Sequence, residues 1–128
     1  MTEAAIVDVE DDDELYRRLA PNHVNADGSV NSVAFMHNWQ PADRLSVDLA
    51  RLTTPKDSLD RAGGREGFKL GVLSATSPRS LGFAVTHDPT PENHSHSVIA
   101  GANDKEKCRR LALATVVLAV PNDATLTR

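Results

Sequence analysis

The sequence contains one cysteine, few aromatic residues and no long hydrophobic run. The single cysteine, Cys108, can form neither an internal disulfide nor a cysteine-based zinc site. No stretch approaches the roughly 18 apolar residues that span a bilayer, and the acidic N-terminus lacks the basic start of a signal peptide. No sequence period recurs, which excludes collagen, coiled coils and repeat arrays. We therefore expect a soluble, cytoplasmic protein that contacts no membrane, and the sequence indicates no cofactor.

The remaining composition is that of a globular protein. The chain has 128 residues, of which 40% are hydrophobic and 25% are charged, and this predicts one domain. Residues 1–14 carry seven acidic and no basic residues, whereas the rest has eleven acidic and fourteen basic residues. We expect residues 1–14 to form an acidic, flexible leader, 15–121 a single globular domain and 122–128 a tail. Repulsion keeps such a leader solvated unless a basic surface of its own body, or of a partner, receives it.

Alternating hydrophobicity predicts six strands. In the segment 45–49, Leu45, Val47 and Leu49 alternate with Ser46 and Asp48, which places the first three inward and the other two outward. The other strands are expected at residues 15–19, 30–36, 68–75, 82–86 and 94–101, and a tight turn is expected at 25–28.

Two helices complete the predicted pattern. Thr54 caps a short helix that ends at Gly63. Asn103, with Glu106 three residues later, resembles a capping box and predicts a second helix that ends before Pro121. The expected inward stripe of that helix is Cys108, Leu111, Thr115 and Leu118. The order β-β-β-α-β-β-β-α predicts an α+β fold: a mostly antiparallel twisted sheet, or a partly open barrel, covered by two helices.

Five short segments form a pattern of their own. They are Leu15–Arg18, Asp27–Phe35, Leu45–Asp48, Thr53–Pro55, and Asp88–Asn93 followed by His96. Together they resemble a family of small uncharacterised prokaryotic proteins. The resemblance covers about residues 14–100 and implies no activity, fold or ligand.

The densest polar cluster lies at residues 88–96. In a strand, His94 and His96 point to the same side, so both imidazoles could reach one phosphate or one metal ion. Histidine also suits general acid/base chemistry, with Asp48 or Glu92 orienting the ring. A metal would need a third ligand, and we predict no metal site. In the alternative interpretation, His94 is a solvated loop residue and His96 is a partly buried one bonded to the backbone.

Two groups of basic residues are candidate binding sites. Arg17 and Arg18, near small hydroxyl and amide side chains, could bind phosphate. Alternatively, they pack at a sheet edge, pair with the leader, or form a buried structural pair with Asp48. Arg109 and Arg110, near the start of the second helix, could contact nucleic-acid phosphates, although few aromatic residues are present for base stacking. The alternative for this pair is a solvated helix face.

Three classes of function follow from these patterns. The sequence favours a non-catalytic binding or accessory module that contacts a protein or a nucleic acid, because no catalytic set is complete and no G-x-S-x-G motif is present. One alternative is a small enzyme acting on RNA or a nucleotide, which requires arginine and histidine side chains to converge on one hollow. The other is a structural homo-oligomer that pairs through an edge strand. Whether the chain is an enzyme stays open at this point.

Overall fold

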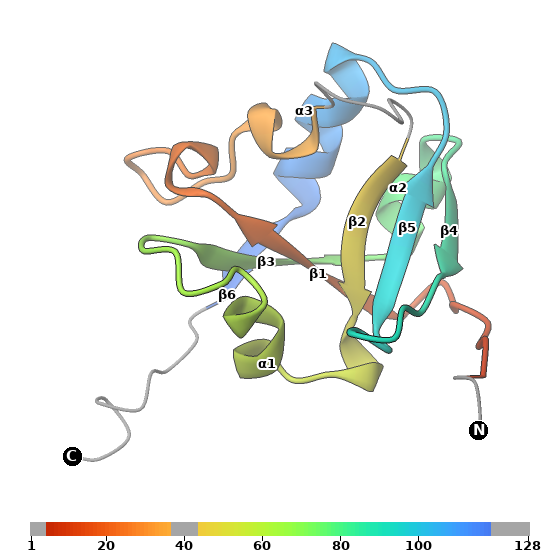
Figure 1. Cartoon of the computed structure of the whole chain (residues 1–128). Coiled ribbons are helices and arrows are strands. Elements are labelled where there is room, and N and C mark those ends of the chain that lie inside the picture. Colours follow the sequence, from red (N-terminus) through yellow and green to blue (C-terminus); the bar gives the residue numbers. More distant parts are fainter. Residues whose placement is uncertain (1–4, 37–43, 119–128) are drawn as a thin grey trace.

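The computed structural model describes residues 5–36 and 44–118. Six strands form one antiparallel sheet in the order β4-β5-β2-β1-β3-β6 (Figure 1). The strands are β1 Glu14–Leu19, β2 Arg44–Leu49, β3 Lys69–Ser74, β4 Ala84–His87, β5 His96–Ala100 and β6 Val116–Leu118. Since β4 and β6 lie at opposite ends of this order, the sheet is open and no barrel closes. The α+β prediction with a mostly antiparallel sheet is confirmed.

Three α-helices and three short 3-10 turns accompany the sheet in the part of the chain that the structure describes. They are α1 Pro55–Asp60, α2 Thr76–Ser80, α3 Lys105–Ala114, η1 Pro21–His23, η2 Ser32–Phe35 and η3 Ala50–Leu52. The start of α1 follows its predicted chemistry, because the Thr54 side chain accepts a hydrogen bond from the Asp57 N–H. None of these helices is long and apolar enough to cross a membrane.

The sheet consists of two parts that share a short seam. Strand β1 pairs with β2 only at Leu15–Leu49 and Tyr16–Asp48, whereas β1 pairs with β3 over six residues and β2 pairs with β5 over five. Figure 1 shows β2, β5 and β4 running steeply across the direction of β1 and β3. Beyond the seam, the Arg17 Nη1 donates to the Ser46 carbonyl at 2.7 Å. A side chain therefore satisfies a backbone group where the ladder ends.

The main core lies between one face of the sheet and the pair α3 and η2. Its largest fully buried side chains include Phe35, Leu15, Leu19, Ile99 and Leu111. Cys108 of α3 is buried in the same cluster, and its thiol contacts the Phe35 carbonyl at 3.3 Å. Burial raises the pKa of this thiol. The protein therefore uses its cysteine as a small core residue.

The predicted strand at 30–36 is wrong, because residues 32–35 form the 3-10 turn η2. The Asn31 side chain accepts from the Val33 N–H, which favours a turn over an extended chain. The neighbours Ala34 and Phe35 are both fully buried, whereas Val33 is 38% exposed. Two consecutive buried residues suit a helical turn and do not fit the alternating burial of a strand.

The end of the last helix also differs from the prediction. Helix α3 begins after Asp104, whose side chain accepts from the Lys107 N–H, so the cap lies one residue later than expected. It ends at Ala114, and Val116–Leu118 form β6 instead of two more helical turns. Consecutive β-branched residues at 115–117 favour an extended chain. Leu118 therefore lies on an edge strand and not on the helix stripe.

The acidic leader contacts the body from Val7 onward, where the Val7 N–H donates to His87 Nδ1 at 3.0 Å. Val9 is 8% exposed, and its carbonyl accepts from Arg79 Nη2 at 2.7 Å. Arg79 Nη1 also reaches Asp11 Oδ1 at 2.7 Å, and Arg51 Nη2 donates to the Asp8 carbonyl at 2.7 Å. Of the two alternatives for the leader, these contacts match the one in which basic side chains of the body receive it. Residues 1–4 and the expected tail at 122–128 lie outside the described residues.

Candidate functional site

Asp48 lies under α1 and is fully buried, so its predicted outward position is wrong. Its Oδ2 accepts from Arg18 Nη1 at 2.8 Å, Arg61 Nη1 at 3.0 Å and Ser58 Oγ at 2.5 Å, and its Oδ1 accepts from Asn93 Nδ2 at 2.8 Å. Burial alone raises the pKa of this carboxyl. The hydrogen bonds from Ser58 and Asn93 and the charges of both arginines outweigh burial and lower it. Asp48 therefore acts as a structural anchor.

Arg17 and Arg18 lie on opposite faces of β1 and do not converge on one site. Arg17 donates through Nε and Nη2 to the Ala34 carbonyl, at 3.1 and 2.8 Å, in addition to its bond to Ser46. Burial, together with the charge of Arg18, lowers the pKa of Arg17 to about 10. Arg18 contacts Asp48 and the Ser58 carbonyl. Both arginines therefore hold backbone and carboxylate groups of their own chain.

The expected histidine pair is not formed. Strand β5 begins at His96, so His94 lies in the preceding turn, where its side chain is exposed and its carbonyl contacts His87 Nε2 at 2.7 Å. Glu92 is exposed in the same turn. Within residues 5–36 and 44–118, no group of three His, Cys, Asp or Glu residues could hold a metal ion.

His96 instead forms a row of polar contacts across β2 and β5. Its Nδ1 lies 2.8 Å from the Asp88 carbonyl and 3.5 Å from Asp88 Oδ2, and its Nε2 lies 3.2 Å from Ser46 Oγ. Arg44 Nη2 lies 3.4 Å from the same Asp88 oxygen. We call Ser46, His96 and Asp88 the polar row. From the sequence, Ser46 was predicted only to face outward, and about fifty positions separate it from His96.

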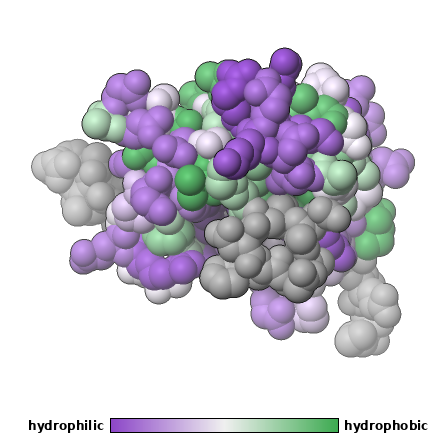
Figure 2. Space-filling view, turned by 90° about the horizontal axis from the view of Figure 1, so that it is seen from above, coloured by the Kyte–Doolittle hydropathy of each residue, from purple (hydrophilic) through white to green (hydrophobic). Residues whose placement is uncertain are grey.

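Arg109 and Arg110 are exposed on α3, and both contact Glu106, at 2.7 and 2.9 Å. The hydrogen bonds and charges of these arginines lower the pKa of Glu106 to about 2. Lys107 donates to the Ala102 carbonyl and lies over a phenylalanine ring. The face seen in Figure 2 is mainly hydrophilic. The basic residues of α3 are therefore partly neutralised within the helix, which does not favour a phosphate-binding stripe.

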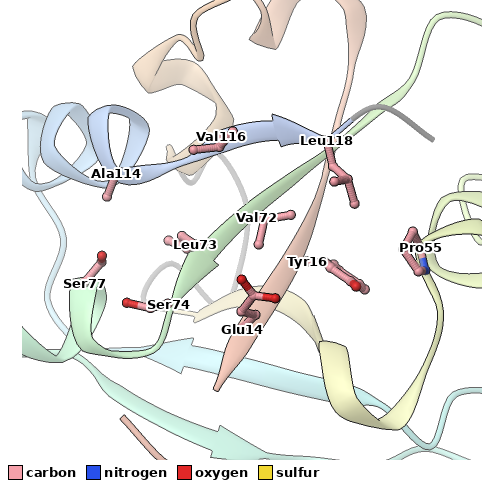
Figure 3. Close-up of a pocket in the computed structure, with 10 residues that line it drawn as sticks. All are labelled: Glu14, Tyr16, Pro55, Val72, Leu73, Ser74, Ser77, Ala114, Val116 and Leu118. Carbon is pink, nitrogen blue, oxygen red and sulfur yellow. The ribbon is translucent and has the colours of Figure 1, made fainter. Parts of the chain in front are cut away.

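A groove of about 630 Å³ opens beside β1, β3 and β6 (Figure 3). It is lined by Glu14, Tyr16, Pro55, Val72, Leu73, Ser74, Ser77, Ala114, Val116 and Leu118. The pairing of β6 with β3 creates it, because Val116 lies opposite Val72 and Leu118 lies opposite Leu70. Sequence reasoning missed this groove, since it treated residues 116–118 as helix.

Tyr16 is one of the polar residues that line this groove. The residue is 8% exposed, and its hydroxyl has no hydrogen-bond partner among the residues that the structure describes. Figure 3 places its ring between Glu14 and Pro55. Burial and the neighbouring charge of Glu14 raise the pKa of Tyr16. The phenol hydroxyl can therefore donate a hydrogen bond to a ligand that enters the groove.

The charge at the mouth of the groove is negative. Glu14 and Tyr16 also line a smaller hollow of about 410 Å³, together with Asp12 and Asp13. Asp13 is paired with Arg51 at 2.8 Å. Glu14 and Asp12 are exposed. An apolar groove with an acidic mouth therefore lies at the point where the leader enters β1.

Comparisons with known proteins relate this chain to no family and no solved structure. No protein-family model matches the chain, and neither a curated protein nor a solved structure matches it. The family resemblance stated from the sequence thus stays a prediction.

Proposed function

We propose that this chain is a protein-binding module, whose groove takes an extended segment of a partner protein. The segment carries a lysine or arginine flanked by aliphatic residues. The observation that carries the proposal is the Tyr16 hydroxyl, which belongs to the groove lining and bonds to none of the residues that the structure describes. Cys108 is a free, buried thiol, which is compatible with a partner met in the cytoplasm.

Three features of the groove support this choice of partner. Val72, Val116 and Leu118 offer an apolar surface to aliphatic side chains. The carboxylate of Glu14, beside the Tyr16 phenol, offers a charge-assisted hydrogen bond to a cation. In the described part of the chain, β6 is the last strand of the sheet, so its outer edge can pair with an added strand. Together these groups complement a basic and aliphatic strand.

The test uses the full chain and a set of synthetic octapeptides with a fluorescent label. The set varies net charge and aliphatic content independently, and fluorescence anisotropy measures the dissociation constant. We expect the basic aliphatic peptides to bind best and to lose affinity as the salt concentration rises. Equal binding of acidic, neutral and basic peptides would refute the proposed charge complementarity.

Two variants separate the groove from the remaining surface. Glu14→Gln should weaken binding about tenfold, because it removes the charge at the mouth. Glu92→Gln, an exposed acid that does not line the groove, should leave binding unchanged. If both variants lose affinity equally, the peptide does not bind in the groove.

Tyr16→Phe distinguishes a role of the Tyr16 hydroxyl in peptide binding from a purely structural role. It should weaken peptide binding up to about tenfold. The free energy of unfolding of the unbound protein should stay unchanged or increase, because the hydroxyl bonds to no residue within 5–36 and 44–118. A large loss of stability would mean that the hydroxyl has a partner inside the protein. Tighter peptide binding by a chain ending at Leu118 would instead assign the groove to residues 119–128.

A further inference from the structure

The polar row is separate from the groove and carries a different chemistry. Ser46 lies on β2, His96 on β5 and Asp88 just after β4, and none of them lines the groove. Ser46 is exposed, and the His96 side chain is 20% exposed, so small molecules can reach both groups. Their order in space is serine, imidazole and aspartate.

The contacts fix which nitrogen of His96 carries the proton. The Asp88 carbonyl, 2.8 Å from Nδ1, can only accept a hydrogen bond, so Nδ1 is the donor. In the neutral ring, Nε2 therefore presents its lone pair to Ser46 Oγ at 3.2 Å. This is the tautomer in which an imidazole can remove the proton of a serine hydroxyl.

From this geometry we infer that Ser46 is a nucleophile activated by His96, and that it reacts with small carboxylic esters. Ser46 Oγ forms a bond to the ester carbonyl carbon while its proton passes to His96 Nε2, and the carbonyl electron pair moves to the oxygen. Collapse of this adduct breaks the bond to the alkoxide, which leaves with the proton from Nε2. Water then attacks acyl-Ser46 by the same route, which releases the acid and restores the hydroxyl.

Two neighbouring groups define the surroundings of the reaction. Asp88 is a positioning residue, and its main-chain carbonyl is closer to Nδ1 than its carboxylate, at 2.8 against 3.5 Å. Arg44 lies on the same face of β2 as Ser46, and its guanidinium contacts Asp88. Arg44 thus balances the charge of the Asp88 carboxylate beside the site.

The experiment treats the full chain with a fluorophosphonate probe and with p-nitrophenyl acetate. Mass spectrometry of peptides from the labelled protein should place the phosphonyl group on Ser46. Ser46→Ala should abolish the labelling, and His96→Gln should slow it about a hundredfold because the base is lost. Asp88→Asn should change the rate only a few fold, since the main-chain carbonyl remains.

Ser29→Ala is the matched control. Ser29 is also exposed and its hydroxyl contacts Asp27 at 2.6 Å, but no imidazole contact to it is present in the described residues. This variant should be labelled at Ser46 at the rate of the unaltered protein. The inference is overturned if the probe spreads evenly over exposed serines, or if His96→Gln reacts at the original rate while its circular dichroism spectrum is unchanged.

Discussion

Replacing Asp48 by asparagine removes one buried charge and keeps the shape of the side chain. In the folded protein this carboxylate contacts two arginines, one from β1 and one from the turn after α1. After the substitution, Arg18 and Arg61 keep their charges and lose the acid that neutralises them. The amide also presents a donor where Ser58 and the arginines now donate.

The expected loss follows from the burial of these partners. Removing one member of a buried ion pair costs about 3–5 kcal/mol, since the remaining charge is left uncompensated. Here the arginine side chains are 23% and 29% exposed, so they can turn partly to water. We therefore expect Asp48→Asn to lower the free energy of unfolding by about 2–4 kcal/mol, a large part of the roughly 5–15 kcal/mol of a typical domain.

Urea unfolding followed by circular dichroism measures this change directly. The midpoint should fall while the slope stays the same, because the variant buries the same surface. Asp60→Asn is the control, since the Asp60 side chain is 61% exposed and pairs with Lys56 at the surface. A loss below about 1 kcal/mol for Asp48→Asn would refute the conclusion that this network anchors α1 to the sheet.

The same carboxylate predicts a dependence on pH. Its pKa is lower in the folded protein than in the unfolded chain, so the folded state binds this proton less readily. Its contribution to stability is therefore complete above the unfolded value of about 4 and is lost as the pH falls through the lower folded value. Asp48→Asn should flatten the stability profile in this acidic range. An unchanged profile would show that the pKa of Asp48 is not lowered on folding.

Three further predictions concern the leader, a glycine and the cysteine. Deleting residues 1–13 should lower the melting temperature by several degrees, because Arg79 loses its leader partners; calorimetry showing no change would mean that the leader contributes nothing. Gly71→Ala should cost about 1–3 kcal/mol in urea unfolding, since the added Cβ would lie 2.6 Å from Thr115 Cγ2; a neutral result would mean that β3 and Thr115 move apart freely. Cys108 should react with a thiol reagent only after unfolding, because it is buried and its pKa is raised, and rapid labelling of the native protein would contradict this.

The sequence predicted the elements whose signals are local and strong. The alternation of Leu45, Val47 and Leu49 placed β2 correctly, because a half-buried strand repeats every two residues. Thr54 followed by Pro55 marked the start of α1, where side-chain capping needs no distant contact. Elements of this kind are encoded within a few neighbouring residues.

Other elements depend on partners far along the chain. Asp48 reads as an outward residue from the alternation of β2, and only the arrival of Arg18, Arg61 and α1 buries it. Residues 116–118 follow a helical stripe and become a strand because β3 offers an edge. Local periodicity contains neither partner, so it gave Asp48 the wrong face of β2 and residues 116–118 the wrong secondary structure.

The candidate sites were harder to predict for the same reason. The groove requires β6, and the polar row requires β2 and β5 to lie in register so that Ser46 meets His96. The sequence pointed to His96 through the polar cluster at residues 88–96 and the reactivity of its imidazole. Its serine partner is an ordinary residue type, and no motif marks it.

The seam between the two parts of the sheet has a mechanical consequence. Only two residue pairs of β1 and β2 bridge it, so main-chain bonding alone would leave a hinge there. Arg17 supports one side of the seam by donating to the Ser46 carbonyl of β2 and the Ala34 carbonyl of η2. Asp48 supports the other side through its two arginines. Stiffness at the middle of this protein thus comes from ionic side chains, in the place where most sheets rely on an unbroken ladder.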